Sequence, residues 1–263
     1  MGTEVYAGLD IGSLSSEALL LGEDGIRAYT IVKTGANPLK AARRCLFEAM
    51  DKAGLEERAV SSLVATGYGR IRVPFAHREV TEITCHARGA HHLFPHTRTV
   101  IDIGGQDSKV IVLDERGRVR DFTMNDRCAA GTGRFLEVMA GALETALSDM
   151  GQRSLEAKKG VSISSMCTVF AESEVISLIA EGYRQEEIIK GLHEAISTRI
   201  FRMTKRLKVG PEITFSGGVA KNQGIVEAMK ALFRMAINIP EEPQIVGALG
   251  AALYARDTAL KPP

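Results

Sequence analysis

A motif that occurs twice at a fixed distance constrains the fold of this chain more than any other feature of its sequence. Asp10-Ile11-Gly12 and Asp102-Ile103-Gly104 start 92 positions apart, at residues 10 and 102. Gly25 and Gly117, each in a polar turn further along, are separated by the same offset. Both motifs end an apolar stretch and are followed by two more strand-like stretches, so the shared offset indicates a duplicated structural unit.

Strand-like and helix-like stretches alternate along the chain, which favours an α/β fold. We expect strands over 5–9, 17–21, 26–32 and 62–66, and again over 99–103, 109–113, 119–124, 212–216 and 236–239. We expect helices over 38–52, 130–147, 168–180, 186–207, 221–235 and 246–256, with a polar stretch at 152–160. No low-complexity linker divides the chain, so we expect two lobes around a cleft, 1–96 and 97–263, with the last helix able to pack back on the first lobe.

The composition excludes several classes of partner. The chain has 263 residues, with 33 Lys and Arg against 32 Asp and Glu, so neither a nucleic-acid surface nor a polybasic membrane anchor is expected. The sequence contains no run of about 18 apolar residues and no secretory signal, so we expect a cytoplasmic protein. Four cysteines are too few and too scattered for a disulfide scaffold.

Two Asp-x-Gly turns that face each other across a cleft would suit a divided phosphate site. Glycine lets backbone N–H groups approach phosphate oxygens, and an aspartate can hold Mg²⁺ through water or orient the attacking water. A single turn of this kind is more often a plain hairpin turn, and the duplication is what favours phosphoryl-transfer chemistry. The predicted catalytic residues are Asp10, Asp102 and Gln106, and the predicted phosphate-binding residues are Gly12, Ser13, Gly104, Gly105 and Asp107.

A third segment, from Phe215 to Asn222, joins a strand to a helix through paired glycines that let the backbone pass close to a base or ribose. The predicted nucleoside-binding residues are Gly217, Gly218, Lys221, Asn222 and Gln244. In their order, the three segments resemble the two phosphate segments and the adenosine segment of the actin, Hsp70 and sugar kinase superfamily. That resemblance implies a duplicated RNase H-like fold with a central nucleotide cleft. The sequence has neither a Walker loop nor a G-x-G-x-x-G motif, so P-loop and Rossmann folds lack their main support.

Two of the four cysteines, Cys128 and Cys167, stand where helices are expected to begin. A helix N-terminus favours a thiolate, so both positions suit metal ligation. Two thiolates are half of the shell of a [4Fe-4S] cluster, which a two-fold dimer would complete; zinc in the same shell, or plain buried cysteines, are alternatives. We assign Cys45 to the apolar face of a helix and leave Cys85, near the start of another helix, without a role.

Eight stretches together resemble one known family, the ATP-dependent activators, or component A, of 2-hydroxyacyl-CoA dehydratases, which are related to the ATPase subunits of benzoyl-CoA reductase. The matching stretches are Gly8 to Ser13, Thr66 to Arg70, Cys85 to Gly89, Ile101 to Asp107, Asn125 to Phe135, Ser164 to Ser177, Gly217 to Asn222 and Gly247 to Ala252. They span nearly the whole chain, and the two cysteine segments are the most specific of them.

The resemblance implies a homodimer with one [4Fe-4S] cluster held by Cys128 and Cys167 of both copies. It implies ATP or ADP with Mg²⁺ in each cleft, a reduced ferredoxin or flavodoxin as electron donor, and an iron-sulfur dehydratase or reductase as acceptor. A heterodimer with a related subunit and a ring-reductase partner are left open. Two other functions also fit the nucleotide segments. One is a small-molecule kinase of the same superfamily, and the other is a nucleotide-dependent scaffold like the actin-like filament proteins.

One departure from the family concerns the first phosphate segment. There, Asp-Ile-Gly-Ser is usually followed by Thr and, three residues later, by Lys, whereas this chain has Leu14 and Glu17. A carboxylate beside a triphosphate repels it unless Mg²⁺ or a basic side chain intervenes. Leu14 and Glu17 therefore leave the nucleotide affinity and the exact phosphate contacts open, with Ser13, Ser15 and Ser16 as candidate hydroxyl partners. The alternative is that the change marks a subfamily, such as one that serves an aromatic-ring reductase.

Overall fold

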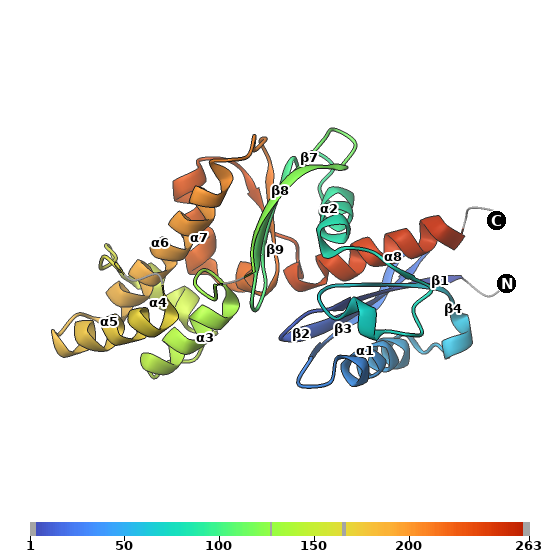
Figure 1. The fold of residues 1–263 in the computed structure, drawn as a ribbon, viewed down its shortest axis with the longest axis horizontal. Helices are drawn as coiled ribbons and strands as arrows, with labels where there is room; N and C mark the ends of the chain where they lie inside the picture. Colours follow the sequence, from blue (N-terminus) through green and yellow to red (C-terminus); the bar gives the residue numbers. More distant parts are fainter. Residues whose placement is uncertain (1–3, 127, 165–166, 260–263) are drawn as a thin grey trace.

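The computed structural model describes residues 4–126, 128–164 and 167–259, in which two five-stranded sheets have the same strand order (Figure 1). The first sheet has the order β3-β2-β1-β4-β5, with β1 (Val5–Ile11), β2 (Ser15–Gly22), β3 (Gly25–Lys33), β4 (Val60–Thr66) and β5 (Arg78–Glu79). The second has the order β8-β7-β6-β9-β10, with β6 (Thr99–Ile103), β7 (Ser108–Leu113), β8 (Val119–Asn125), β9 (Ile213–Ser216) and β10 (Ile237–Asn238). In both sheets the first three strands pair antiparallel, and the fourth runs parallel to the first. The predicted duplication and the α/β fold are confirmed.

The strand register extends the duplication to individual residues. Asp10 on β1 lies opposite Thr66 on β4, and Asp102 on β6 lies opposite Ser216 on β9. In parallel sheets the carboxyl ends of neighbouring strands meet at one edge, which is where ligands of such folds bind. Each lobe therefore presents an aspartate and a hydroxyl side chain at the same edge of its sheet.

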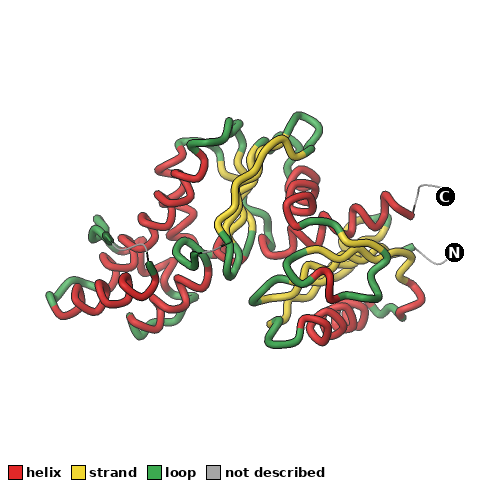
Figure 2. The backbone as a smooth tube through the Cα atoms, in the orientation of Figure 1, coloured by secondary structure: helices red, strands yellow, loops and turns green. Residues whose placement is uncertain are grey.

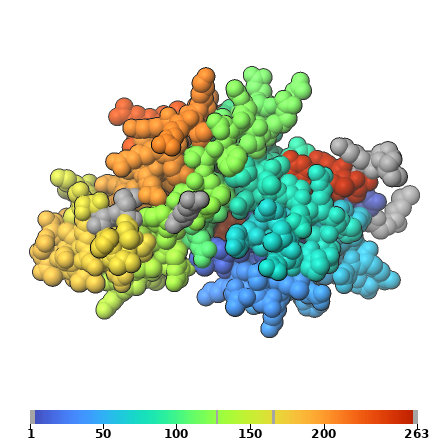
Figure 3. All heavy atoms as spheres, in the orientation of Figure 1, coloured from blue at the N-terminus to red at the C-terminus, as the bar shows by residue number. Residues whose placement is uncertain are grey.

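Helices cover both faces of each sheet (Figures 1 and 2). On the first sheet, α1 (Pro38–Ala53) packs on one face and α8 (Val246–Ala259) on the other. On the second sheet, α2 (Glu82–Leu93) packs on one face, and the other face is covered by α3 (Gly133–Ala142), α6 (Gln185–Thr204) and α7 (Gln223–Phe233). Two further helices, α4 (Met150–Glu156) and α5 (Thr168–Ala180), extend this layer away from the first lobe (Figure 3).

Helix α1 shows how local sequence sets these elements. Asn37 caps its start by accepting a hydrogen bond from the Lys40 backbone N–H, and Pro38 occupies the first turn, where no N–H partner is needed. Gly54 ends the helix in the left-handed conformation, with φ 65°. Its buried stripe includes Cys45, which lies in the core as predicted.

Two expectations about helices were wrong. The helix predicted over 130–147 covers only Gly133–Ala142, because the chain turns there and Glu144 adopts a positive φ of 50°. The polar stretch 152–160 is partly helical, since α4 is anchored by the fully buried Met150. The polar composition of this stretch did not indicate a helix. Packing of one buried face is nevertheless enough to stabilise a short helix.

Helices α2 and α8 cross at very close range between the two sheets. A Cβ on Gly250 would lie 1.8 Å from the Cys85 carbonyl oxygen, and one on Gly89 would lie 2.1 Å from that of Val246. The last helix does pack on the first sheet, as anticipated, while α2 contacts both α8 and the second sheet. The domain limits 1–96 and 97–263 stay a prediction.

Candidate functional site

The two aspartates of the repeated motif occupy equivalent positions in the two lobes. Asp10 and Asp102 are 7% and 3% exposed, near the ends of β1 and β6. The residue that follows the neighbouring parallel strand is a glycine with φ +84° in both copies, Gly67 and Gly217. A Cβ there would lie 2.4 Å from Asp10 Oδ1 and 2.9 Å from Asp102 Oδ1. Both glycines are therefore required by their backbone conformation and by the carboxylate packed against them.

One imidazole connects these two carboxylates. His86 on α2 has Nε2 3.6 Å from Asp10 Oδ2 and Nδ1 3.4 Å from Asp102 Oδ1. Ser216 Oγ donates to Asp102 Oδ1 at 2.9 Å and lies 3.3 Å from His86 Nδ1. Burial lowers the pKa of His86, but Asp102 and Asp10 outweigh burial and raise the pKa above its ordinary value. A protonated His86 would neutralise part of the charge of both aspartates.

Lys109 on β7 completes the charge balance around Asp102. Its Nζ lies 2.6 Å from Asp107 Oδ1, 3.3 Å from Asp102 Oδ2 and 3.4 Å from Glu82 Oε2. Burial opposes the charge on Lys109, but these carboxylates outweigh it and raise the pKa of Lys109. Burial likewise opposes ionisation of Asp102, but His86 and Lys109 hold the pKa of Asp102 below its usual range. Asp102 is therefore a fixed, fully charged carboxylate, suited to orienting water or Mg²⁺.

The two Asp-x-Gly turns lie against each other. The Gly104 N–H donates to the Asp107 carbonyl at 3.0 Å and closes the second turn. Leu14, which follows the first turn, packs on Gly105 so closely that a Cβ there would lie 2.5 Å from Leu14 Cδ1. Gln106 is exposed between them. The structure brings the predicted phosphate-binding turns together, with an apolar side chain where the family usually has threonine.

The hydroxyl groups of the first turn are divided between two tasks. Ser16 is fully buried and shares a hydrogen bond with Thr34 at 2.8 Å, and Thr34 Oγ1 also donates to the Gly12 carbonyl at 2.8 Å. Ser16 therefore fixes the shape of the turn and is not available to a phosphate. Ser13 and Ser15 are partly exposed and remain candidates for ligand contacts.

The third segment closes the cleft from the second lobe. The Gln244 Nε2 donates to Ser15 Oγ across the two lobes at 3.5 Å and lies beside Gly218, where a Cβ would be 3.6 Å from it. Lys221 pairs with Glu242 at 2.8 Å and is 44% exposed at the side chain. Gln244 therefore lies beside Gly218 and reaches Ser15 of the first lobe, and contacts of Gly217, Gly218, Lys221 and Gln244 with a nucleoside stay a prediction.

Asn222 has a structural task in addition to its predicted one. Its Oδ1 accepts the Ile225 backbone N–H at 3.1 Å and caps α7, and its amide lies 3.3 Å from His193 Nε2. The helix predicted to start at residue 221 therefore begins at Gln223. Any contact of Asn222 with a nucleoside stays a prediction.

Glu17 is buried close to the carboxylates of the candidate site, and its effect on phosphate binding stays a prediction. It lies on β2 opposite Asp10 and is 4% exposed. Burial, and next the charge of Asp10, raise the pKa of Glu17 well above its ordinary value. A raised pKa favours the neutral carboxyl group, which repels a triphosphate less than a carboxylate does.

The four cysteines fall into two groups. Cys45 and Cys85 are fully buried, and burial raises the pKa of each thiol to about 12. Cys167 is exposed at the N-cap position of α5, as expected for a ligand at a helix start. Cys128 is half-buried but does not begin a helix, because the cap of α3 is Thr132. Only Cys128 and Cys167 are accessible to a metal, and two thiolates per chain fit half of a four-thiolate shell.

Sequence reasoning missed His86, Glu82 and Lys109. The only signal was that the stretch from Cys85 to Gly89 belongs to the family pattern, and nothing in the spacing shows that α2 reaches both aspartates. Within the described ranges, no three His, Cys, Asp or Glu side chains cluster as a metal site inside one chain. No helix in the described part of the chain is long and apolar enough to cross a membrane.

The fold and the divided cleft define a nucleotidase of the class that includes actin, Hsp70 and the sugar kinases. The sequence matches the model of the BadF/BadG/BcrA/BcrD ATPase family over residues 7–255. The chain belongs to this family and is an ATPase. It is 46% identical over 254 residues to a 2-hydroxyisocaproyl-CoA dehydratase activator from Clostridioides difficile, covering 96% of this chain and 95% of that protein.

Two other relatives are an (R)-2-hydroxyglutaryl-CoA dehydratase activating ATPase from Acidaminococcus fermentans and a subunit of the benzoyl-CoA reductase from Thauera aromatica. The first is 42% identical and covers 97% of this chain and 98% of the relative. The second is 31% identical and covers 95% and 92%. The two relatives named as dehydratase activators are thus more similar to this chain than the reductase subunit is.

Solved structures agree with this assignment. Component A of the Acidaminococcus fermentans (R)-2-hydroxyglutaryl-CoA dehydratase has a TM-score of 0.94 at 40% identity, covering 98% of this chain and all of that one. The Clostridium difficile 2-hydroxyisocaproyl-CoA dehydratase activator with bound ADPNP has a TM-score of 0.93 at 45% identity, covering 97% and 95%. A ROK family glucokinase from Streptomyces griseus, at 14% identity, covers 96% and 99% with a TM-score of 0.60, which shows the shared fold alone.

Proposed function

We propose that this protein is an ATP-driven electron donor to a 2-hydroxyacyl-CoA dehydratase, working as a homodimer around one shared [4Fe-4S] cluster. The observation that carries the proposal is the division of the cysteines. Cys128 and Cys167 are accessible, whereas Cys45 and Cys85 are buried thiols whose pKa is raised to about 12. A cluster bound by the accessible pair of two copies would store one electron and release it to the acceptor.

The surface beside Cys167 supports a protein contact at this end of the molecule. Val169 and Phe170, at the start of α5, are each 67% exposed, and Ile176 further along the helix is 56% exposed. Large apolar side chains exposed together usually mark an interaction site. A second copy, and then the acceptor, would cover them.

Nucleotide binding would act through residues that already join the lobes. In the proposal, Asp10 and Asp102 hold Mg²⁺ and orient the attacking water, and Gly12, Ser13, Gly104 and Gly105 receive the phosphates. A ligand shifts a conformational equilibrium only by binding one arrangement better than the other. Because the site is divided between the lobes and His86 contacts both aspartates, bound nucleotide would favour one lobe arrangement, and α5 moves with its lobe.

The acceptor class follows from the relatives. The relatives named as dehydratase activators are 46% and 42% identical and the reductase subunit is 31% identical, which favours a dehydratase over the ring-reductase alternative. A reduced ferredoxin or flavodoxin is the proposed source of the electron. The kinase reading has support only from the shared fold.

The test is anaerobic purification with iron and sulfide analysis alongside the mass in solution. About four irons per dimer are expected, and Cys128→Ser or Cys167→Ser should lose them. Cys45→Ala and Cys85→Ala serve as matched controls and should keep the iron, because both thiols are buried away from solvent. A colourless monomer lacking iron after strict exclusion of oxygen would contradict the proposal.

A further inference from the structure

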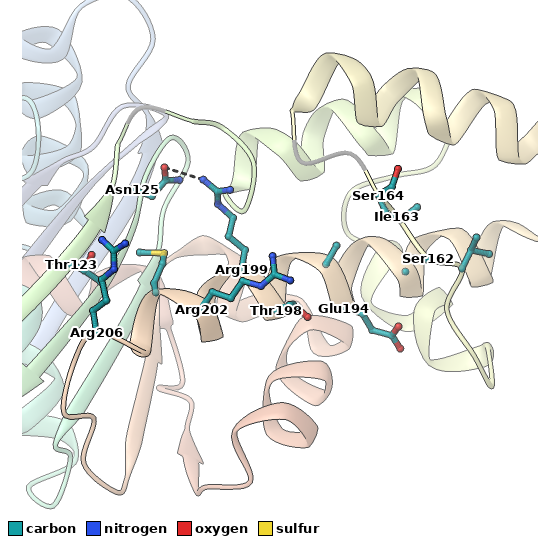
Figure 4. Close-up of a pocket in the computed structure, with 14 residues that line it drawn as sticks. Thr123, Asn125, Ser162, Ile163, Ser164, Glu194, Thr198, Arg199, Arg202 and Arg206 are labelled. Carbon is teal, nitrogen blue, oxygen red and sulfur yellow. Dashed lines mark hydrogen bonds between the residues drawn. The ribbon is translucent and has the colours of Figure 1, made fainter.

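A groove of about 580 Å³ lies in the second lobe, away from the nucleotide cleft (Figure 4). Helix α6 forms one side, with the end of β8 at Thr123 and Asn125, and the segment 161–164 closes the other side. Its size is that of a ligand site, but it is open along its length and lined by both polar and apolar side chains, with Glu194 among the charged ones. Nothing in the ATPase reaction as argued above uses it.

Three arginines dominate the chemistry of this groove. Arg199 and Arg202 lie on α6, and Arg206 follows two residues after the last residue of that helix, Thr204; all three line the groove and form an arginine stripe along it. No ion pair joins any of the three to a carboxylate within the described ranges. Arg199 donates to Asn125 Oδ1 at 3.3 Å, while its buried Nε has no partner among the described residues. Guanidinium groups without a carboxylate partner, gathered along one groove, suit the binding of carboxylates or phosphates.

The groove lies between the two segments that carry the accessible cysteines. Asn125 ends β8, and its side-chain amide donates to the Cys128 carbonyl at 2.8 Å. On the other side, Ser164 bonds Glu174 of α5 through its N–H and its hydroxyl, three residues before Cys167. A protein that fills this groove would therefore contact both segments at once and lie next to the proposed electron-carrying centre.

A second copy of this chain is a poor occupant for electrostatic reasons. A dimer that shares Cys128 and Cys167 has its two-fold axis near the groove, so an interface built on the groove would bring two arginine stripes together. Like charges that face each other across an interface repel and cost affinity. An acidic partner gains attraction from the same arginines instead.

We propose that the Arg199–Arg202–Arg206 groove docks an acidic surface of the small electron-carrier protein that reduces this ATPase. The inference rests on the proposed function. One electron leaves the carrier, which is oxidised, and arrives at the centre held by the two accessible cysteines, which is reduced; no atom or proton is transferred. Contacts of this kind are small and strongly dependent on ionic strength.

The test compares two double variants with the same change of total charge. Arg202→Glu with Arg206→Glu reverses the exposed end of the groove, and Arg116→Glu with Arg120→Glu reverses exposed arginines at the other end of β8. The measurements are the rate constant of reduction by a purified acidic ferredoxin, the binding of oxidised ferredoxin by calorimetry, and reduction by methyl viologen radical as a small cationic reductant. We expect the groove variant to lose about tenfold in rate and in ferredoxin affinity at about 0.05 M salt, a loss that fades near 0.5 M. The control variant should change less than twofold.

Several outcomes would overturn the docking proposal. A groove variant that matches the control shows that the arginines do not meet the carrier. A groove variant that becomes monomeric shows that the groove is a contact between copies. If inorganic phosphate abolishes ferredoxin binding at an ionic strength at which sodium chloride does not, the groove is a site for small anions. Unchanged reduction by methyl viologen with slower reduction by ferredoxin supports docking, since the centre itself is then intact. If the wild type contains no iron, the proposed function is contradicted. The docking proposal is then still tested by the calorimetric titration with ferredoxin.

Discussion

Asp10 and Asp102 belong to different sheets, yet His86 contacts both, at 3.6 Å from Asp10 and 3.4 Å from Asp102. The imidazole comes from α2, which packs on α8 of the first lobe and on the second sheet. An ATPase of this fold must bring two half-sites together, and here one buried side chain contacts the aspartate of each. A change in either half-site is therefore felt by the other through His86.

Replacing Asp102 by Asn should abolish ATP hydrolysis and leave the iron content unchanged. Asp102 is fixed by Ser216, His86 and Lys109, so the amide should keep the geometry while the charge is lost. We expect phosphate release to fall by about 100-fold, in the range typical for removal of a positioned acid or base. Asp121→Asn on the exposed side of β8 is the control and should hydrolyse ATP normally. Undiminished turnover would remove Asp102 from the catalytic residues.

Replacing Glu17 by Gln should stabilise the protein, increasingly so as the pH rises. The pKa of Glu17 is raised by burial and by Asp10, so the unfolded state releases its proton at a lower pH than the folded state. Stability is then lost between about pH 4.3 and the raised pKa, by about 1.4 kcal/mol for every tenfold difference between the two acid dissociation constants. Gln removes this loss and should leave nucleotide affinity unchanged.

The measurement for Glu17 is urea unfolding of the variant and the wild type at pH 5 and pH 7.5. Glu23→Gln in the exposed turn between β2 and β3 is the control and should show no dependence of this kind. A Gln variant that is equally destabilised at both pH values would mean that an ionised Glu17 is part of the fold.

His86 should make the stability fall as the pH rises above about 6.5, the ordinary pKa of histidine. Its folded-state pKa is raised, so its stabilising charge is fully present below that pH and is lost as the pH passes through the raised pKa. The gap in free energy of unfolding between the wild type and His86→Gln should therefore shrink from pH 6 to pH 9. His92, whose pKa is lowered by partial burial and by Arg256, provides the control, and His92→Gln should not reproduce this trend. A constant gap would show that His86 is neutral throughout.

Alkylation should separate the four cysteines of protein stripped of iron. Iodoacetamide at pH 8 is expected to label Cys167 first and Cys128 next, because the first thiol is exposed and the second half-buried. Cys45 and Cys85 should react only after unfolding, since burial raises the pKa of each to about 12. Peptide mass spectrometry reads out each site. Labelling of Cys85 ahead of Cys128 would contradict the assignment of ligands by accessibility.

Local patterns that repeat along the chain could be predicted from the sequence, whereas contacts between residues far apart in the chain mostly could not. The offset between Asp10 and Asp102 was sufficient to predict two like sheets, because each motif ends a strand whose pattern is local. The link through His86 was not predictable, since it depends on the packing of α2 between the lobes. The burial of Glu17 beside Asp10 was not predictable for the same reason, since it depends on how the lobes and strands pack around that strand position. Cys128 was placed at a helix start, whereas the chain turns for several residues before Thr132 caps α3.

The crossing of α2 and α8 should tolerate no side chain larger than hydrogen at Gly250. A Cβ there would lie 1.8 Å from the Cys85 carbonyl oxygen and 2.6 Å from its carbonyl carbon, both of them backbone atoms that cannot move aside alone. We expect Gly250→Ala to cost about 3 kcal/mol, at the upper end for overpacking, and to lower the midpoint of thermal unfolding by roughly 5–10 °C. Gly141→Ala is the matched control, because Gly141 is also helical but nothing lies within 4 Å of a Cβ there. That substitution should be neutral or stabilise by up to about 1 kcal/mol, as alanine replaces glycine in an open helix position. Equal unfolding midpoints for the two variants would show that α2 and α8 can move apart at little cost, and that their close crossing does not hold the lobes together.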